Sequence, residues 1–146
     1  MSGAADPGAV VAVARSWIGT PYHDQASLRG AGSDCLGLVR GVWREVVGAE
    51  PLAVPPYSRD WGEVGGREVL LEAARRVLLE IEPAAAGPGA VLLFRMRLSA
   101  PAKHAGILTA PGAFVHAYDR TGVIEERLTR AWRRRVAFAF LYPARG

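Results

Sequence analysis

The order of the hydrophobic patterns along the chain is the feature that most limits its fold. Helical spacing of apolar residues gives way to strand-like alternation in the second half. The predicted helices cover residues 7–18, 34–47 and 67–81, and the predicted strands cover residues 90–96, 103–109, 113–119, 123–128 and 135–142. Helices first and a meandering antiparallel sheet of about five strands last indicate an α+β fold. At 146 residues and 50% hydrophobic, with no obvious linker or repeat, residues 1–146 are predicted to form a single domain.

Cys35 is the only cysteine of the chain, and it stands where a polar loop turns into the second predicted helix. An apolar stripe from Cys35 to Val46, with Ser33 or Asp34 as N-cap, places the thiol in the first helical turn. There the positive end of the helix dipole and the backbone N–H groups favour a thiolate and can hold an oxyanion. Cys35 is therefore a candidate nucleophile, and the alternative is a small buried core residue.

Two of the three histidines, His104 and His116, lie in consecutive strand-like segments with a turn signal at residues 110–112. A three-residue loop sets Gly106 opposite His116 and puts both histidines on one face of the sheet. A two-residue loop shifts the register by one residue and separates them. Core histidines satisfied by backbone groups are the alternative, but a pair on one face beside a helix-start cysteine favours catalysis.

Together these segments resemble the NlpC-type cell-wall peptidases, which are compact papain-like cysteine hydrolases. The resemblance covers most of the chain, and the order and spacing of its motifs agree with the family. The motifs are Trp17-Ile18-Gly19-Thr20-Pro21-Tyr22, Asp34-Cys35-Leu36-Gly37-Leu38, Pro88-Gly89-Ala90-Val91-Leu92, His104-Ala105-Gly106-Ile107 and Phe114-Val115-His116-Ala117. The resemblance implies the papain-like NlpC fold, with N-terminal helices packed on a C-terminal antiparallel sheet.

Carried over residue by residue, the resemblance implies a Cys-His-His triad. Cys35 is the nucleophile, His104 the general base, and His116 the group that orients His104. Tyr22 matches a tyrosine beside the oxyanion site and Asp34 an acid next to the substrate cleft, the alternatives being a half-buried turn residue and a plain N-cap. The implied reaction is hydrolysis of an amide bond in peptidoglycan stem peptides, after D-glutamate and toward diaminopimelate, with no metal or other cofactor.

Two features depart from the commonest pattern of the family. Leu36 stands where many relatives have Ser, which would remove a hydrogen bond to the substrate peptide. The segment at residues 49–82 is unusually long and contains Pro51, Pro55, Pro56 and Asp60-Trp61-Gly62. With Asp-Cys-Leu-Gly-Leu-Val, Gly-Val-Trp and a late Trp-Arg-Arg-Arg, the chain resembles the phage-tail branch, the cell-wall peptidases of tailed phages and gene transfer agents.

The positive charge is concentrated near the C-terminus. The net charge of +4 arises from seventeen Arg and one Lys, and we do not interpret it as a nucleic-acid signature. A basic cluster consists of Arg127, Arg130, Arg133, Arg134 and Arg135. This arginine cluster is either a solvated edge or a contact for an acidic partner or anionic wall polymer.

No signal peptide, lipobox cysteine or membrane-spanning segment is expected from the sequence. Because peptidoglycan lies outside the cytoplasm, we expect a protein made in the cytoplasm, carried with phage-like tail or baseplate proteins, and active in the recipient's periplasm. The tail neighbours would contact the arginine cluster or the segment around Pro55. The alternatives are a structural or hub-associated tail protein that retains the fold without the chemistry, and an acyltransferase using the same triad.

Overall fold

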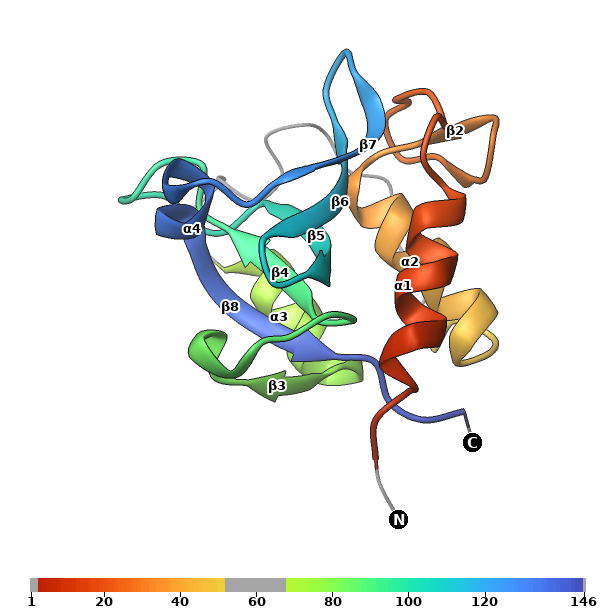
Figure 1. The fold of residues 1–146 in the computed structure, drawn as a ribbon, viewed down its shortest axis with the longest axis horizontal. Coiled ribbons are helices and arrows are strands. Elements are labelled where there is room, and N and C mark those ends of the chain that lie inside the picture. Colours follow the sequence, from red (N-terminus) through yellow and green to blue (C-terminus); the bar gives the residue numbers. More distant parts are fainter. Residues whose placement is uncertain (1–2, 52–67, 146) are drawn as a thin grey trace.

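The computed structural model describes residues 3–51 and 68–145. Its helices are α1 (Pro7–Ser16), α2 (Cys35–Val46), α3 (Val69–Val77) and α4 (Arg130–Arg135), with a 3-10 turn η2 (Pro83–Ala85). Its strands are β1 (Ser27–Leu28), β2 (Gly32–Ser33), β3 (Leu79–Ile81), β4 (Val91–Phe94), β5 (His104–Ala110), β6 (Ala113–Tyr118), β7 (Gly122–Arg127) and β8 (Val136–Leu141). Figure 1 shows this arrangement, and it confirms the predicted α+β class.

An antiparallel sheet with the strand order β3-β8-β4-β5-β6-β7 forms the centre of the molecule. Strands β4 to β7 form the predicted meander. The last strand leaves it: β8 returns to the free side of β4 and also pairs with β3. A separate two-stranded ladder, β1 with β2, lies just before α2.

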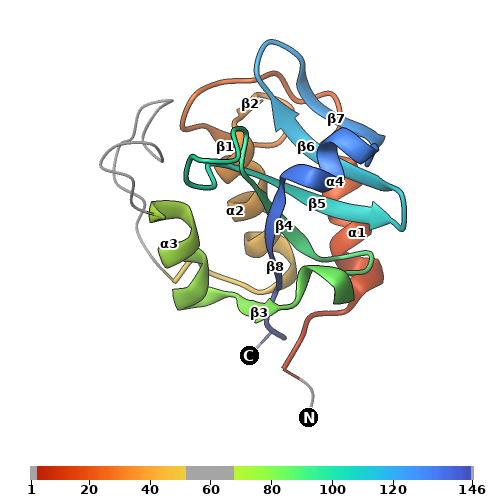
Figure 2. The ribbon, with the colours of Figure 1, turned by 90° about the vertical axis from the view of Figure 1, so that its left-hand side faces the viewer.

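The two faces of the sheet carry different cores. On one face, α1, α2 and α3 pack their apolar residues, Leu38 and Val42 among them, against Ile107 and Val115. On the other face, Phe94 and Phe114 pack against Trp132 of α4. Figure 1 shows α1 and α2 on one side of the sheet and α4 on the other, and Figure 2 shows α3, α2 and α1 in that order across the molecule.

One predicted element is wrong in its extent, and one helix was not predicted. The helix predicted to reach residue 81 ends at Val77, because Leu78 is extended (φ −104°, ψ 164°) and the following residues form β3 against β8. The strand predicted from residue 135 is preceded by α4, whose first turn is capped by the Thr129 side chain. Its Trp132 is buried, which explains why this charged stretch forms a helix here.

The two ends of the described chain are held together. Ala5 N–H donates to Tyr142 O at 2.8 Å, and Ala144 N–H donates to Gly3 O at 2.7 Å. The predicted helix start at Arg67 and most of the long segment singled out at residues 49–82, with Pro55, Pro56 and Asp60-Trp61-Gly62, lie outside the described residues. Within the described ranges, no helix has the length and apolar character needed to cross a membrane.

Candidate active site

Asp34 fixes the start of the nucleophile helix. Its Oδ1 accepts the Gly37 N–H at 2.7 Å, and its Oδ2 accepts the Gln25 N–H at 2.6 Å. The side chain thereby caps α2 and ties the preceding loop to it, in a position that is only 3% exposed. These contacts support the N-cap interpretation of Asp34. The role of an acid beside the substrate cleft, which the resemblance implies for Asp34, would need a carboxylate that already accepts two backbone N–H groups.

Cys35 meets strand β5 at its first residues. Its Sγ lies 3.8 Å from the carbonyl oxygen of Lys103, and the Ala105 N–H acts on the same sulfur. These two residues flank His104 directly, so α2 and β5 bring the predicted nucleophile and the predicted base together. The residue as a whole is partly exposed, whereas its thiol is desolvated by burial.

Helix α2 approaches the sheet from the face opposite to the expected one. We expected the start of α2 to lie against the sheet face that carries both histidines, but α2 packs on the opposite face, against Ile107 and Val115. The rings of His104 and His116 lie on the face of Phe94 and Trp132. The expectation is wrong because side chains alternate along a strand, and the residues of β5 that contact α2 are the neighbours of His104. Cys35 therefore contacts the strand backbone on either side of His104.

The two histidines are in contact. His104 Nε2 and His116 Nδ1 are 2.8 Å apart, and His116 is fully buried. The turn between their strands is the two-residue one, with Ala110 opposite Ala113. A β-bulge between Leu108 and Ala110 reverses the one-residue shift that this turn causes. Ile107 therefore lies opposite Val115, which is the register predicted for a three-residue loop. The predicted shared face is confirmed, although the loop differs.

The absence of a side chain at Gly106 leaves space for His116. A Cβ built at this position would lie 3.0 Å from Phe114 Cδ2 and 3.2 Å from His116 Cβ. The family-like sequence His-Ala-Gly-Ile thus has a steric reason at its glycine. Without a side chain there, the ring of His116 can approach His104 across the two strands.

Glu126 is a member of the site that the sequence did not reveal to us. Its Oε1 lies 2.7 Å from His116 Nε2, and its side chain is 35% exposed. In the β6–β7 ladder His116 lies opposite Ile124, which makes Glu126 its diagonal neighbour on the same face. The alternation Val-Ile-Glu-Glu-Arg and the short connection after Tyr118 were the signals that could have indicated it.

Aromatic rings enclose the histidine pair. The Trp132 ring centroid lies 5.1 Å from that of His116 and 5.9 Å from that of His104. Phe94 is 5.7 Å from His104, and Phe114 is 4.3 Å from His116. Because these residues cover both imidazoles, water reaches the pair poorly, and electrostatic interactions inside it are stronger than in solvent.

The environment favours the uncharged forms of the nucleophile and base. Burial, followed by the charge of Asp34, raises the pKa of the Cys35 thiol to about 12, although the N–H groups of Ala105, Leu36 and Cys35 itself act to lower it. The expected thiolate is therefore wrong for the resting protein, because desolvation outweighs the helix start. Burial, followed by the charges of His116 and Lys103, lowers the pKa of His104 to about 3. The resting pair is a thiol beside a neutral imidazole.

Tyr22 lies in the same neighbourhood as the nucleophile. It forms an isolated backbone bridge with Ser33 and is half-buried. Burial raises the pKa of its phenol, and the charges of Cys35 and Asp34 raise it further, which places the hydroxyl near both groups. The phenol therefore keeps its proton and can donate a hydrogen bond. Leu36 is partly buried and packs against the helix-side core.

A cavity lies at the loop between β4 and β5. It has a volume of about 370 Å³, and its described lining is Met96, Arg97, Ala100, Pro101 and Lys103. Lys103 is also the residue whose carbonyl oxygen contacts the thiol of Cys35. The cavity thus shares Lys103 with the contact to Sγ, and its lining includes the two cationic residues Arg97 and Lys103.

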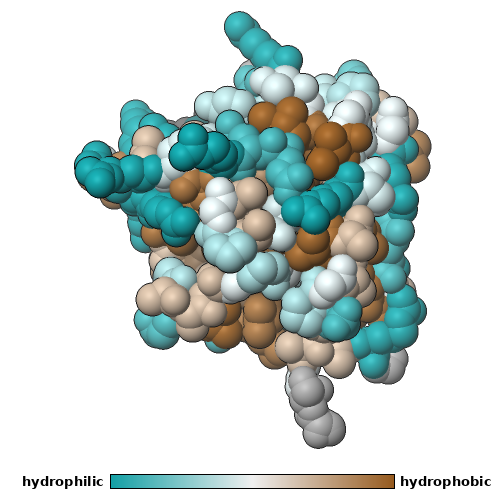
Figure 3. Space-filling model, in the orientation of Figure 1, coloured by the Kyte–Doolittle hydropathy of each residue, from teal (hydrophilic) through white to brown (hydrophobic). Residues whose placement is uncertain are grey.

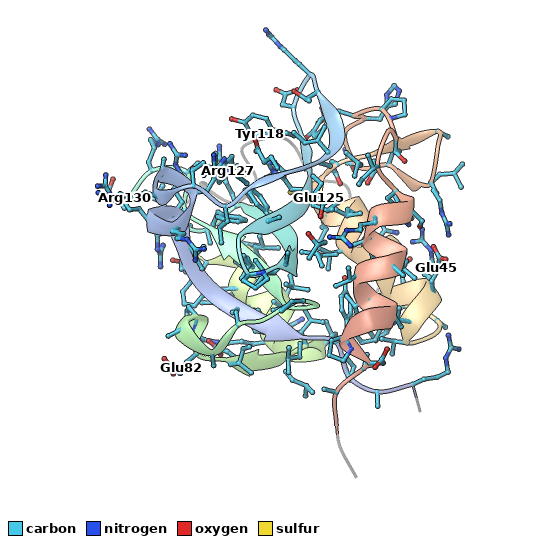
Figure 4. The ribbon with its side chains drawn as sticks, viewed as in Figure 1. Glu45, Glu82, Tyr118, Glu125, Arg127 and Arg130 are labelled. Carbon is cyan, nitrogen blue, oxygen red and sulfur yellow. The ribbon has the colours of Figure 1, made fainter. Side chains whose placement is uncertain are left out.

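The arginine cluster covers α4 and the end of β7. Arg127, Arg130, Arg133 and Arg134 are exposed, and Arg135 lies over the Trp132 ring at 5.3 Å. Among residues 3–51 and 68–145, none of the five forms an ion pair, whereas Arg15, Arg40 and Arg75 each pair with a glutamate. Figure 3 shows hydrophilic side chains gathered over α4, and Figure 4 shows Arg127 and Arg130 there, with Glu125 nearer α1.

No family model matches the sequence, and no curated protein matches it. Solved structures do match. The chain is similar to the NlpC/p60 domain of the peptidoglycan hydrolase SagA, with 22% identity and a TM-score of 0.63 over 92% of this chain and 97% of that one. The fold is that of an NlpC/p60 domain. This confirms the predicted papain-like NlpC fold.

Two further NlpC/p60 structures belong to longer chains. An NlpC/P60 family protein from Bacillus cereus has 15% identity and a TM-score of 0.67 over 95% of this chain and 41% of its own. NlpC2 from Trichomonas vaginalis has 17% identity and a TM-score of 0.62 over 99% of this chain and 49% of its own. The chain thus spans less than half the length of these two proteins.

In the described part of the chain, no three His, Cys, Asp or Glu side chains are grouped to hold a metal ion.

Proposed function

We propose that this chain is a cysteine peptidase that hydrolyses an amide bond in peptidoglycan stem peptides. The observation that carries the proposal is the placement of Cys35 Sγ between the two neighbours of His104, while His104 is hydrogen-bonded to His116. These contacts support a nucleophile, a base and an orienting group at one site, the set that covalent catalysis of acyl transfer requires. The NlpC/p60 fold, which SagA uses as a peptidoglycan hydrolase, supports the same class of reaction.

The proposed reaction begins from the neutral pair. His104 takes the thiol proton as Sγ attacks the carbonyl carbon, and the oxyanion is held by N–H groups at the start of α2 and by the Tyr22 hydroxyl. The imidazolium then gives its proton to the departing amine, which leaves a thioester on Cys35. Water, deprotonated by His104, attacks the thioester carbonyl and releases the new carboxylic acid together with the thiol. Hydrogen-bonding to His116 keeps the His104 ring in the required orientation throughout.

The proposed bond is D-glutamyl-diaminopimelate. Stem peptides carry free carboxylates on both residues, and the lining of the cavity at the loop between β4 and β5 includes Arg97 and Lys103. The test is incubation of the purified protein with stem-peptide fragments, followed by mass spectrometry. A new free amine on diaminopimelate is the expected product, while cleavage elsewhere in the peptide would replace the proposed bond and keep the class.

We further propose that the protein acts from a phage-like tail and opens the recipient's wall during delivery. The Trp-Arg-Arg-Arg stretch that resembles the phage-tail branch forms α4, whose exposed arginines offer a contact for acidic tail neighbours. The competing proposal is a structural tail protein that keeps the fold without the chemistry. Leu36, which stands where many relatives have Ser, and the long segment at residues 49–82 favour that alternative.

Particles that incorporate Cys35→Ala separate the two proposals. The enzymatic account expects particles of normal number and shape that attach but deliver DNA poorly. The structural account expects full delivery by these particles, and defective assembly when Arg130 and Arg134 are both changed to Gln. Counting particles by electron microscopy alongside delivery for both variants decides between them.

A further inference from the structure

Glu126 continues the line of hydrogen bonds that starts at the predicted base. His104 Nε2 and His116 Nδ1 are 2.8 Å apart, and His116 Nε2 and Glu126 Oε1 are 2.7 Å apart. Both nitrogens of the His116 ring are therefore engaged, one on each side. The line runs from β5 through β6 to β7, which are neighbouring strands of the sheet.

The proton positions along this line follow from what each group can do. An ionised carboxylate only accepts hydrogen bonds, so His116 Nε2 must carry the proton that faces Glu126. A neutral imidazole carries one proton, which leaves His116 Nδ1 as an acceptor for the N–H of His104 Nε2. His104 then has no proton on Nδ1. That nitrogen is the one remaining atom of the pair that can accept the Cys35 proton.

We propose that Glu126 is a positioning residue, which sets the tautomers of both histidines and stabilises the positive charge that forms on His104 when it takes the proton of Cys35. The inference rests on the proposed thiol chemistry of this site, and it does not depend on the identity of the substrate. In the absence of the carboxylate, His116 can carry its proton on Nδ1 and donate to His104, which moves the His104 proton to the nitrogen needed as base.

The charges around the pair explain why a carboxylate is needed. Burial lowers the pKa of His116, and the hydrogen bond and charge of Glu126 act against that shift. Lys103, just before β5, acts in the opposite sense, because its charge lowers the pKa of His104. The Tyr118 ring on β6 also faces the pair, and so does Trp132 on α4, with Arg135 above its indole. Phe94 and Phe114 complete the enclosure without charge. Glu126 is the anion bonded to the pair.

Glu125 provides a matched control on the same strand. Its Oε2 accepts from Thr109 Oγ1 at 2.5 Å and from Arg15 at 3.0 Å, so it faces α1 and the other side of the sheet. Glu126→Gln and Glu125→Gln remove the same charge from adjacent residues with little change in volume. A folded state comparable to that of the wild type, measured by thermal unfolding, is required of both before they are compared.

Nitrogen NMR of the two histidines is the first test, and it needs no substrate. We expect His104 and His116 both protonated on Nε2 in the wild type and in Glu125→Gln. In Glu126→Gln, we expect His116 to gain a population protonated on Nδ1. A wild-type spectrum with the proton of His116 on Nδ1, or a spectrum unchanged by Glu126→Gln, overturns the proposal.

Alkylation of Cys35 by iodoacetamide is the second test. Loss of Glu126 removes part of the roughly 10²- to 10⁴-fold contribution of a general base, so we expect the rate at pH 7 to fall about tenfold or more in Glu126→Gln. Glu125→Gln should stay within about twofold of the wild type, and equal rates for the two variants overturn the proposal. If stem peptides are not cleaved while both tests give the expected result, the proposed function fails and the role of Glu126 stands.

Discussion

At the scale of single residues, the surroundings of each side chain decide its chemistry. Cys35 stands at a helix start that favours a thiolate, yet burial and Asp34 hold its pKa near 12. His104 is equally desolvated, and its pKa falls to about 3. Both shifts oppose a preformed ion pair. Proton transfer therefore accompanies the attack of sulfur on the substrate, and the groups that support the imidazolium gain in importance.

The two histidines should differ in what their loss costs. His104→Ala removes the proton acceptor, so we expect kcat to fall by roughly 10²- to 10⁴-fold. His116→Asn keeps a hydrogen-bonding group beside His104 and should cost less. Steady-state hydrolysis of a stem peptide measures both, with His23→Ala, at an exposed loop position, as the control. A greater loss at position 116 would indicate that His116 is the base, and equal losses would contradict the division into a base and an orienting group.

Stability should fall as the solution becomes acidic. The pKa values of His104 and His116 are lowered in the folded state, so below about pH 6.5 the unfolded chain binds more protons than the folded one. Each histidine then removes up to about 1.4 kcal/mol of unfolding free energy per pH unit. Urea unfolding at pH 7, 6 and 5 measures this slope. We expect a shallower slope for His104→Asn than for the wild type; identical slopes for the two proteins would contradict the account.

The predicted site residues were those whose local sequence carries the signal. A polar loop that turns into an apolar stripe identifies Cys35, and strand alternation pairs His104 with His116. Glu126 depends on the register of a third strand, and its role becomes visible only when β6 and β7 are aligned. The raised pKa of Cys35 depends on how deeply the finished fold buries it, which no local pattern reports.

At the scale of secondary structure, the β5–β6 hairpin determines whether the histidines meet. Its two-residue turn alone would separate them, and the bulge between Leu108 and Ala110 restores the register. Neither the bulge nor its position is apparent from Ala110-Pro111-Gly112. The helix expected to reach residue 81 likewise stops early because β3 pairs with β8, about sixty residues away in the sequence. Such long-range partners limit what periodicity can predict.

Gly106→Ala should damage this hairpin. The added methyl group would lie 3.0 Å from Phe114 Cδ2 and 3.2 Å from both His116 Cβ and Val115 O. We expect a loss of about 1–3 kcal/mol in unfolding free energy and a lower kcat, because the strands must move apart. Gly112→Ala in the turn, where nothing lies within 4 Å, is the matched control. Should the two variants behave alike in unfolding and in hydrolysis, the steric argument fails.

Asp34→Asn tests how the start of α2 is built. Asn keeps an acceptor for the Gly37 N–H but removes the charge and one acceptor for Gln25, so we expect a loss of about 1–2 kcal/mol. The pKa of Cys35 should fall, because the Asp34 charge raises it, and alkylation at pH 8 should become faster. Asp6→Asn, at the N-cap of α1, should leave Cys35 reactivity unchanged. Slower alkylation in Asp34→Asn would contradict the electrostatic assignment.

At the scale of the whole molecule, the helix that begins with the predicted nucleophile and the ring of the predicted base lie on opposite faces of the sheet. Helix α2, which begins with Cys35, covers one face of the sheet together with α1 and α3, and the histidine pair occupies the other face. The Cys35 thiol contacts the backbone next to His104, where β5 begins. The order of helices and strands was sufficient to predict the α+β class, and the resemblance of the motifs implied the NlpC-type fold. It did not indicate the face on which each group lies, because that depends on strand alternation within the assembled sheet.

Release of soluble fragments from purified peptidoglycan tests the central claim most directly. The wild type, Cys35→Ala and the control His23→Ala are incubated with the same material, and the products are identified by mass spectrometry. Ala favours the helix and removes only the sulfur, so the Cys35→Ala protein should fold normally. We predict that the wild type and His23→Ala release stem-peptide fragments and that folded Cys35→Ala releases none. Release by Cys35→Ala at the wild-type rate would contradict the assignment of Cys35 as the nucleophile.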